Sequence, residues 1–430
     1  MDRPQSVSSV RLRNGGIVDR KRIWIINHYA NHPSLPGGTR HYELARRWVA
    51  DGFDVTILCS SFHHKLHASA RDFRGACFIE ETDGVRFVWL RSRFRYSSNG
   101  LRRILSMVEF AVRAWWVGRT CVAARIPKPD AIIGSSPHPL APVAAWRLAK
   151  RFGTPFLLEI RDLWPETLVQ MGVLSRRHPI ARALLRLEKT LYGRAASVIS
   201  LLPGIRAYLD GIGMGQVPVV VVPNGVDTQA FRCRHETPTH EGAVLRVVYA
   251  GAHGPANGLD TVLNAAQRLR DDRQIQFLLY GDGARKTALM QQARERHLEN
   301  LEFRDAVPKI DMPEVLCSAD ILLLNYAKIG IGEYGISPNK LWEYMSCGKP
   351  IIFAHEAVNN PVASTECGVT VPPERPDLLA DAVVSLAALP ANKRREMGQR
   401  GRAYALQHHD WDILAIRMAE AIEAVISGAS

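Results

Sequence analysis

The sequence predicts an α/β protein made of two domains, each built on a parallel sheet. Three observations predict this class: a length of 430 residues, short apolar runs that alternate with helical patterns, and a second round of this alternation after mid-chain. A chain of this length is too long for one hydrophobic core and favours two domains of about 200 residues. Strands that alternate with helices form βαβ units, in which neighbouring strands run parallel.

The first half opens with such a unit. An apolar run at 23–26 has the character of a buried strand, a helix is expected over about 40–51, and a second strand at 54–58. The loop between the first strand and the helix carries Gly37 and Gly38, which let the backbone approach a ligand closely. Residues 60–100 read as irregular up to a strand at 85–90. Later strands are expected at 131–134, 155–158 and 196–201.

The second half repeats this rhythm. A glycine-rich loop that contains Gly251 and Gly254 follows a strand at 245–250 and precedes a helix at 259–270. Further strands are expected at 276–280, 301–304, 321–324 and 350–353. The predicted domain plan is a disordered extension over 1–20, a first domain over 21–215, a second domain over 216–405, and a last helix over 406–430 that crosses back to the first domain.

The stretch 334–350 carries the most specific signal. Ser337 is expected as the N-cap of a short helix, with Pro338 in its first turn, followed by Asn339 and Lys340. A helix that begins at the end of a sheet strand directs unpaired N–H groups into the cleft, where they can hold phosphate. Glu343, one turn later, can accept two hydroxyl hydrogen bonds, as from a ribose. The alternative is an ordinary buried helix with a solvated Lys and Glu.

Two strand ends of the first domain carry further candidates. His138 follows the strand at 131–134 and is expected at the mouth of the sheet, where ligands bind. The strand at 155–158 leads into Glu159, Arg161 and Asp162 beside a tryptophan, a combination that is unusual for a core. The acidic residues either assist the chemistry or form an ion pair with Arg161 that fixes the loop.

The composition restricts the class of protein. Residues 1–215 contain 33 Lys and Arg against 16 Asp and Glu, and residues 216–430 contain 22 against 26, so the excess positive charge lies in the first half. This distribution favours an anionic surface or ligand on that half. Seven scattered cysteines without a CxxC pair indicate reduced thiols, not a metal site or a disulfide framework. No apolar run is long enough for a transmembrane helix.

The segment 91–125 interleaves arginines with large apolar side chains, and Arg176 begins a second basic helix. A basic amphipathic helix with paired tryptophans can lie on an anionic membrane surface. The alternative is a helix that faces the core and has a solvated basic back. Nucleic acid is not an expected partner, because no nucleic-acid-binding motif is visible.

Taken in order, the motifs PGGT, EIRDLWPE, VPNGVD, NGLDTVLNAA, YGDG and SPNKLWEYMSCGKP resemble those of retaining glycosyltransferases of family 4. The resemblance covers about residues 22–425 and is strongest to the bacterial branch for O-antigen and capsule, typified by N-acetylfucosaminyltransferases. It implies the GT-B architecture, in which two Rossmann-like domains face a central cleft.

The resemblance also implies roles for matched residues. Glu343 would bind the nucleotide ribose, and the N–H groups around Ser337, Asn339 and Lys340 would hold the diphosphate. His138 would contact the transferred sugar. Gly37 and Gly38 would let the first loop approach the phosphate or the acceptor. The resulting catalytic candidates are His138, Lys340 and Asp162, and the donor-binding candidates are Gly37, Gly38, Gly251, Gly254, Ser337, Asn339, Lys340, Glu343 and Arg161.

This chain departs from the family pattern at two places. Gly335 stands eight residues before Glu343, where the family often has a first glutamate, and Glu333 is two residues out of register. The family loop usually carries an Arg and a Lys for the diphosphate, and the corresponding positions here are Ala252 and Asn257. Lys340 is therefore the first candidate to meet the phosphate charge, and Arg161 the second.

The expected function is transfer of a sugar from a nucleoside-diphosphate donor to a lipid-linked or saccharide acceptor in surface polysaccharide synthesis. The expected donor is UDP-linked, with an N-acetylated amino sugar as one candidate. No metal or cofactor is expected. The expected location is cytoplasmic, peripheral on the inner face of the cell membrane. Two alternatives stay open: a nucleotide-sugar epimerase of the same shape, and a non-catalytic scaffold for a membrane assembly.

Overall fold

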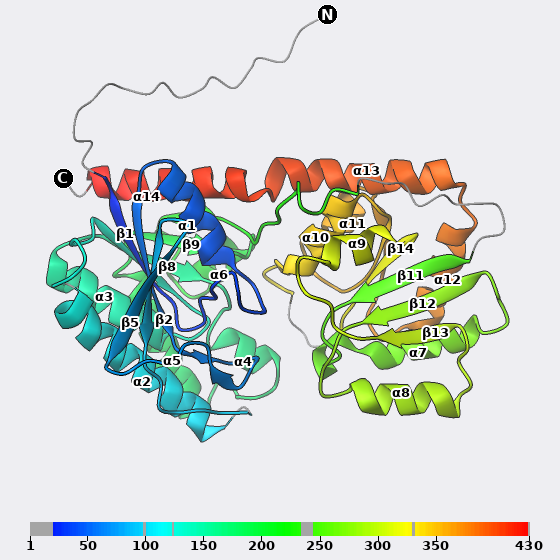
Figure 1. The fold of residues 1–430 in the computed structure, drawn as a ribbon, viewed down its shortest axis with the longest axis horizontal. Coiled ribbons are helices and arrows are strands. Elements are labelled where there is room, and N and C mark those ends of the chain that lie inside the picture. The colour runs from blue at the N-terminus through cyan, green and yellow to red at the C-terminus, as the bar shows by residue number, and fades with distance from the viewer. Residues whose placement is uncertain (1–19, 98–99, 123, 234–243, 329–331, 429–430) are drawn as a thin grey trace, which may run out of the picture.

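The computed structural model describes residues 20–97, 100–122, 124–233, 244–328 and 332–428. The chain forms two lobes, each with a central sheet covered by helices on both faces (Figure 1). The two-domain parallel-sheet class predicted from the sequence is confirmed. The predicted extension over 1–20 lies outside the described residues, except for its last residue.

Within the described residues, the first lobe holds an eight-stranded sheet in the order β10-β9-β8-β7-β1-β2-β6-β5. Its strands are β1 (Arg22–Ile26), β2 (Asp54–Ser60), β5 (Cys77–Thr82), β6 (Val85–Leu90), β7 (Ala131–Ser135), β8 (Phe156–Ile160), β9 (Ser197–Ser200) and β10 (Val219–Val221). All neighbours pair in parallel except β5, which pairs antiparallel with β6 and forms one edge. A small hairpin, β3 (Phe62–His63) and β4 (Ala68–Ser69), stands apart from this sheet.

Helices cover both faces of the first sheet. They are α1 (Arg40–Ala50), α2 (Leu101–Val117) with a π-helical extension (Gly118–Val122), α3 (Leu140–Phe152), α4 (Glu166–Gln170), α5 (Pro179–Tyr192) and α6 (Ile205–Gly211). The inner strands β1, β7 and β8 are buried over almost their whole length. Continuous apolar runs therefore form strands here, because parallel strands between two helix layers have no solvent face.

The second lobe holds a parallel sheet in the order β13-β12-β11-β14-β15-β16. Its strands are β11 (Leu245–Ala250), β12 (Ile275–Tyr280), β13 (Leu301–Arg304), β14 (Ile321–Asn325), β15 (Ile351–Ala354) and β16 (Gly368–Val371). Its helices are a 3-10 turn (Pro255–Asn257), α7 (Leu259–Arg268), α8 (Lys286–Glu295), α9 (Met312–Cys317), α10 (Asn339–Cys347), α11 (Pro361–Ser364), α12 (Pro376–Ala387) and α13 (Ala391–His408).

The last helix, α14 (Trp411–Gly428), returns to the first lobe and packs against α1. Figure 1 shows α13 and α14 in succession along one side of both lobes. Trp48 of α1 donates a hydrogen bond from Nε1 to the carbonyl oxygen of Ala415, 2.9 Å away. Gly225 has no room for a Cβ, because the ring of Trp411 would lie 2.7 Å from it. The crossing helix thus completes the core of the first lobe.

The structure corrects three expectations about the elements. The boundary at residue 215 is too early, because β10 pairs in parallel with β9 and belongs to the first sheet. The region 60–100 is not simply irregular, since it contains β5 and the β3–β4 hairpin. The basic segment 91–125 is helical only from Leu101, and the residues before it that are described form a loop.

The expectation of unpaired thiols is wrong for one pair. Cys233 and Cys317 form a disulfide between residues 84 positions apart in the sequence, which spacing alone cannot reveal. The sulfur of Cys347 lies close to this pair, with all three sulfur atoms within 4.8 Å of one another. Cys59, Cys77, Cys347 and Cys367 carry free thiols.

No helix in the described parts of the chain is both long enough and apolar enough to cross a bilayer.

Candidate functional site

Two cavities lie where the lobes meet. The first, named here the hinge cavity, has a volume of about 300 Å³ and is bounded by the loop before α10, by Asn224 and by α4. The second, the lysine cavity, has a volume of about 430 Å³ and is lined by Lys65, Gly38 and Asn339 among others. Arg161 and Asp162 line both cavities, so the loop after β8 lies at their junction.

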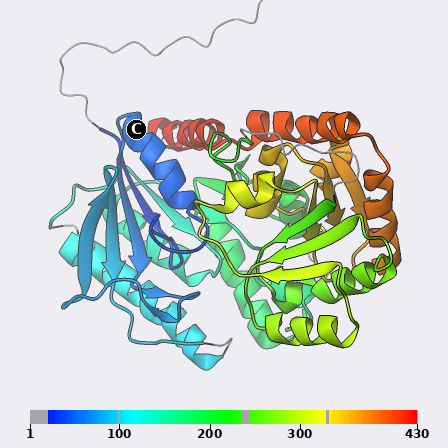
Figure 2. The same ribbon diagram turned by 45° about the vertical axis from the view of Figure 1, so that its right-hand side comes forward.

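The amino end of α10 faces both cavities. Ser337 and Pro338 line the hinge cavity, and Asn339 lines the lysine cavity. In Figures 1 and 2, α10 lies on the side of the second lobe that faces the first. No described side chain caps this helix, so its first N–H groups are available to a ligand. The prediction that the amino end of this segment faces an interdomain crevice agrees with this geometry.

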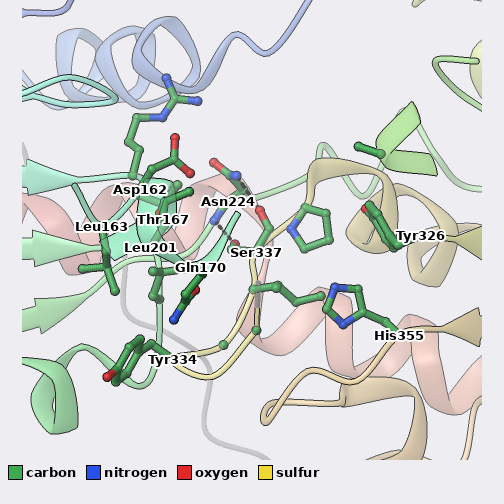
Figure 3. A pocket seen from close by; sticks show the side chains of 17 residues that line it. Asp162, Leu163, Thr167, Gln170, Leu201, Asn224, Tyr326, Tyr334, Ser337 and His355 are labelled. Atoms are coloured by element: carbon green, nitrogen blue, oxygen red, sulfur yellow. Dashed lines mark hydrogen bonds between the residues drawn. The ribbon is translucent and has the colours of Figure 1, made fainter. Parts of the chain in front are cut away.

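The prediction that Ser337 caps the helix is wrong. The N-cap residue is Pro338, and the hydroxyl of Ser337 accepts a hydrogen bond of 2.7 Å from the backbone N–H of Asn224. The amide of Asn224 donates a second bond of 2.6 Å to the carbonyl oxygen of Ser337. Figure 3 shows this pair at the wall of the hinge cavity. Ser337 therefore ties the loop before α10 to the chain segment between the lobes.

Lys340 extends from α10 over the first βα loop of the second lobe. Its Nζ donates to the hydroxyl of Tyr249 at 3.2 Å and lies 4.9 Å from the centre of that ring. A Cβ at Gly251 would overlap this ammonium group, so the glycine is required for the lysine to lie there. Burial lowers the pKa of Lys340 to about 8, while Glu343 acts against this shift and Lys65 adds to it.

Glu343 lies one turn further along α10 and is half-buried. Among the described residues it makes no hydrogen bond and no ion pair within 4 Å. Burial raises the pKa of its carboxyl group, and Lys309, Lys340 and Lys65 oppose that shift in this order. A half-buried acceptor that forms no hydrogen bond with the described residues fits the role of binding hydroxyl groups.

The glycine pair of the first lobe approaches α10 directly. A Cβ at Gly38 would lie 3.0 Å from the amide nitrogen of Asn339. Gly37 has a φ of +126°, and a Cβ there would lie 2.5 Å from the amide nitrogen of Asn31. Gly38 is thus needed for close contact across the cleft, whereas Gly37 is needed for its own backbone conformation and for the close approach of Asn31 within the first lobe. Gly254, by contrast, has space for a side chain, since a Cβ would lie 3.7 Å from Asn257.

His138 is almost fully buried behind Pro137, which lines the lysine cavity. Its Nε2 lies 2.9 Å from Nδ1 of His28, and its Nδ1 has no partner in the described structure. Burial and the charge of Arg103 lower the pKa of His138 to about 3, so the imidazole is neutral. The structure places His138 directly after a residue that lines the lysine cavity, but His138 itself lines neither cavity.

The acidic candidates after β8 separate into two roles. Glu159 is fully buried, accepts a hydrogen bond of 2.8 Å from Nε of Arg40 and one of 2.6 Å from Nε2 of His41, and therefore holds α1 against the sheet. One alternative expected Glu159 to form an ion pair with Arg161, but Glu159 pairs with Arg40 and His41 instead. Asp162 opens onto both cavities, and desolvation by the surrounding protein raises the pKa of its carboxyl group.

Gly335 lines the hinge cavity with a φ of +90°. A Cβ there would lie 2.7 Å from Asn359 and 2.8 Å from Pro203, so a glutamate does not fit without rearrangement. Glu333 accepts a hydrogen bond of 3.1 Å from the amide of Gln170 on α4. Glu333, which lies near the family position, therefore links the second lobe to α4 of the first lobe.

Sequence reasoning missed Lys65 and Lys309. Lys65 follows the short strand β3, and Lys309 lies in the loop between β13 and α9. Neither belongs to a motif, and they are 244 residues apart, so only the fold brings them to Glu343. One feature of the sequence indicated that cationic side chains must come from elsewhere: the loop 251–258 contains no Lys or Arg.

Comparisons with known proteins agree with this geometry. Residues 37–225 match the model for the Glycosyl transferase 4-like domain, and residues 245–388 match that for Glycosyl transferases group 1. Each match falls within one lobe, and the cleft lies between them. The chain is therefore a glycosyltransferase whose two lobes correspond to these two domains.

Curated relatives and solved structures extend the comparison. The chain is 24% identical over 389 residues to the putative colanic acid biosynthesis glycosyl transferase WcaI of Escherichia coli, covering 86% of this chain and 93% of the relative. It is 23% identical over 305 residues to the probable glycosyltransferase WbjE of Pseudomonas aeruginosa, covering 69% and 73%.

Among solved structures, a sucrose-phosphate synthase from Thermosynechococcus elongatus superposes with a TM-score of 0.74 at 18% identity, covering 95% of this chain and all of that one. WaaG, a glycosyltransferase involved in lipopolysaccharide biosynthesis, superposes with a TM-score of 0.64 at 16% identity, covering 93% and 99%. The predicted GT-B fold is confirmed.

Proposed function

We propose that this glycosyltransferase transfers a sugar, with retention of anomeric configuration, from a UDP-sugar to a lipid-linked or saccharide acceptor in surface polysaccharide synthesis. The observation that carries the proposal is the uncapped amino end of α10, with Lys340 beside it, at the junction of two cavities between the lobes. The relative WcaI supports the polysaccharide role through its name alone, which refers to colanic acid biosynthesis.

The donor class rests on chemistry and on a fold neighbour. Helix N–H groups and an ammonium group suit a diphosphate, and the partner-free Glu343 suits a ribose. The Anabaena protein HepE, whose crystal structures are in complex with UDP and UDP-glucose, shares the fold with a TM-score of 0.66 for the UDP complex. We extend UDP from that protein to this one as part of the proposal.

In the proposed reaction, the bond between the anomeric carbon and the diphosphate oxygen breaks, and the acceptor oxygen forms a new bond to the same face of that carbon. Negative charge develops on the leaving diphosphate, which the N–H groups of α10 and Lys340 stabilise. The acceptor proton passes to the departing phosphate, so the step balances without a protein base. As part of this proposal, the reaction requires no metal or cofactor.

Three residues have proposed roles near the reacting carbon. Asp162 and Arg161 lie at the junction of the cavities, where they can orient the acceptor hydroxyl and the sugar. The family role of His138 requires its ring to reach the sugar past Pro137, which now lines the cavity in front of it. Closure of the lobes around the donor would supply such a shift and exclude water.

The membrane partner is proposed from α2. Five of its large apolar side chains recur at helical spacing and are exposed: Leu101 (70%), Ile104 (56%), Val108 (44%), Val112 (60%) and Trp116 (45%). We name this surface the α2 apolar face. Such a stripe, on the lobe with the positive charge excess, suits the interface of an anionic bilayer. A third cavity, with Tyr96 and His67 in common with the lysine cavity, opens at Leu101 beside this face.

The test is a donor screen with polyprenyl-linked and free saccharide acceptors, read by mass spectrometry. A glycosylated acceptor with retained anomeric configuration by NMR supports the proposal. Conversion of the donor in the absence of any acceptor would instead identify an epimerase. Binding of vesicles without turnover or nucleotide binding would identify a scaffold.

A further inference from the structure

We propose that Lys65 and Lys309 bind the diphosphate of the donor together with Lys340, in place of the cationic side chains that the loop 251–258 lacks. This inference rests on the proposed function and names the residues that meet the phosphate charge. It also revises the expectation that Arg161 is the second phosphate contact.

Lys65 reaches the site from the first lobe. It extends from the loop of the β3–β4 hairpin, lines the lysine cavity and passes the glycine pair, where a Cβ at Gly37 would lie 3.4 Å from its Nζ. Its ammonium group makes no hydrogen bond and no ion pair within 4 Å of any residue that the structure describes. A long cationic side chain at a cavity wall that forms no hydrogen bond or ion pair with the described residues is available to an anion.

Lys309 reaches the same region from the second lobe. Its Nζ donates to the hydroxyl of Thr39 at 3.4 Å, directly after the glycine pair. Because Gly38 in turn approaches Asn339 at the start of α10, the loop 37–39 brings Lys309 and Lys65 to the same helix end. Lys309 forms no ion pair within the described parts of the chain.

The charges around Glu343 are unbalanced without a ligand. Lys309, Lys340 and Lys65 all act electrostatically on this single carboxyl group. Repulsion from Lys309 lowers the pKa of Lys65, and repulsion from Lys65 lowers the pKa of Lys340. In both cases the repulsion adds to the larger effect of desolvation. Three ammonium groups against one carboxylate leave a net positive charge of two. The diphosphate of a nucleotide sugar carries two ionised acid groups at neutral pH, which matches this excess.

The arrangement also couples binding to the position of the lobes. Lys65 belongs to the first lobe, whereas Lys309 and Lys340 belong to the second. A diphosphate between them attracts both sides of the cleft. We therefore infer that the donor itself draws the lobes together through these side chains, before the acceptor hydroxyl is aligned.

The experiment compares UDP with uridine by isothermal titration calorimetry on the full chain. The variants are Lys65→Gln, Lys309→Gln and the double variant, with Lys65→Arg as the conservative change. Lys128→Gln removes the same charge from an exposed position before β7, at the opposite end of the sheet strands, and serves as the control. Thermal unfolding checks that each variant is folded, as expected for exposed side chains.

Each single Gln variant should weaken UDP binding by about tenfold to a hundredfold, as expected for loss of one charged hydrogen bond. Uridine binding should not change, because uridine has no phosphate. Lys65→Arg should restore most of the UDP affinity, and the control should match the wild type.

If the wild type binds UDP but both Gln variants bind it equally well, the inference is overturned while the proposed function stands. If UDP and uridine weaken in parallel, the lysines do not contact the phosphates, and the inference is likewise overturned. If the wild type binds no nucleoside diphosphate, the proposed function itself is refuted, and this inference with it.

Discussion

At the scale of single residues, the site depends on charges placed where burial opposes them. Lys340 is the clearest case, because it is drawn over Gly251 and away from bulk water. The sequence identified Lys340 and Glu343 from their position at the start of a helix. It did not identify Lys65 and Lys309, whose charges act on Glu343, because both lysines approach through loops with no recognisable motif.

Replacement of Lys340 by Ala should reduce turnover by about a hundredfold to a thousandfold. The physical reason is loss of one preorganised group opposite the charge on the leaving diphosphate, worth on the order of 2.7–4 kcal/mol. Steady-state kinetics at saturating donor measure this, with circular dichroism as the folding check. Near-normal turnover would remove Lys340 from the proposed mechanism.

The affinity for UDP should depend on pH through Lys340. With a pKa of about 8 in the free protein, its amine is charged below that pH and increasingly neutral above it. A bound anion favours the charged form, so the pKa rises on binding and a proton is taken up. UDP affinity should therefore fall as the pH increases from 7 to 9.5. Calorimetry in buffers of different ionisation enthalpy measures the uptake, and Lys340→Met should abolish most of it.

Replacement of Glu343 by Ala should weaken UDP and uridine binding together, by about tenfold to a hundredfold, because the ribose is common to both ligands. The same calorimetric comparison distinguishes this residue from the lysines, which should affect UDP alone. An unchanged affinity for uridine would contradict the ribose role.

At the scale of elements, helices with similar composition serve different purposes. The helix α10 is buried along Leu341, Trp342, Tyr344 and Met345, so its pattern is that of a core helix, although its amino end lines the two cavities. The helix α2 instead leaves much of its apolar surface exposed, although Phe110 and Ala114 on its other side are buried. Periodicity alone cannot make this distinction, because both arrangements produce an amphipathic pattern.

Substitution of Ile104 and Val112 by Ser should weaken binding to phosphatidylglycerol vesicles by at least about tenfold. Both side chains are more than half exposed, and each contributes apolar area that would enter the bilayer interface. Vesicle sedimentation measures the change. The matched control replaces Val384 and Ile416, exposed at 46% and 56% on α12 and α14, by Ser. Equal loss in both double variants would exclude a specific role for the α2 apolar face.

At the scale of the whole molecule, the segment between the lobes is fixed from both sides. Asn224 bonds to Ser337 on the second lobe, and its carbonyl oxygen lies 3.0 Å from Nδ1 of His409, before α14. The ring of His409 stacks on Trp342 of α10, with 3.3 Å between ring centres. The helix α10, the connection and the crossing helix therefore form one contiguous unit, which suits concerted motion of the lobes.

Replacement of Met418 by Ala should destabilise the first lobe by about 2–5 kcal/mol, because this fully buried side chain of α14 fills the core beneath α1. Denaturant unfolding followed by tryptophan fluorescence measures the loss. UDP binding at low temperature should persist, since Met418 is a core residue and is not among the residues proposed to bind the donor. No loss of stability would show that α14 is not part of that core.

The sequence by itself determined the class of fold, the order of most strands, and the candidate site at the start of α10. These properties follow from local patterns: apolar runs, glycine loops and a helix start, each readable within a few residues. The tertiary structure decided which charges meet across the cleft, that Glu159 is structural, that Ser337 serves the connection between the lobes, and that Cys233 pairs with Cys317. Such interactions join residues far apart in the chain, and only the packing of both lobes and the return of α14 bring these residues near one another.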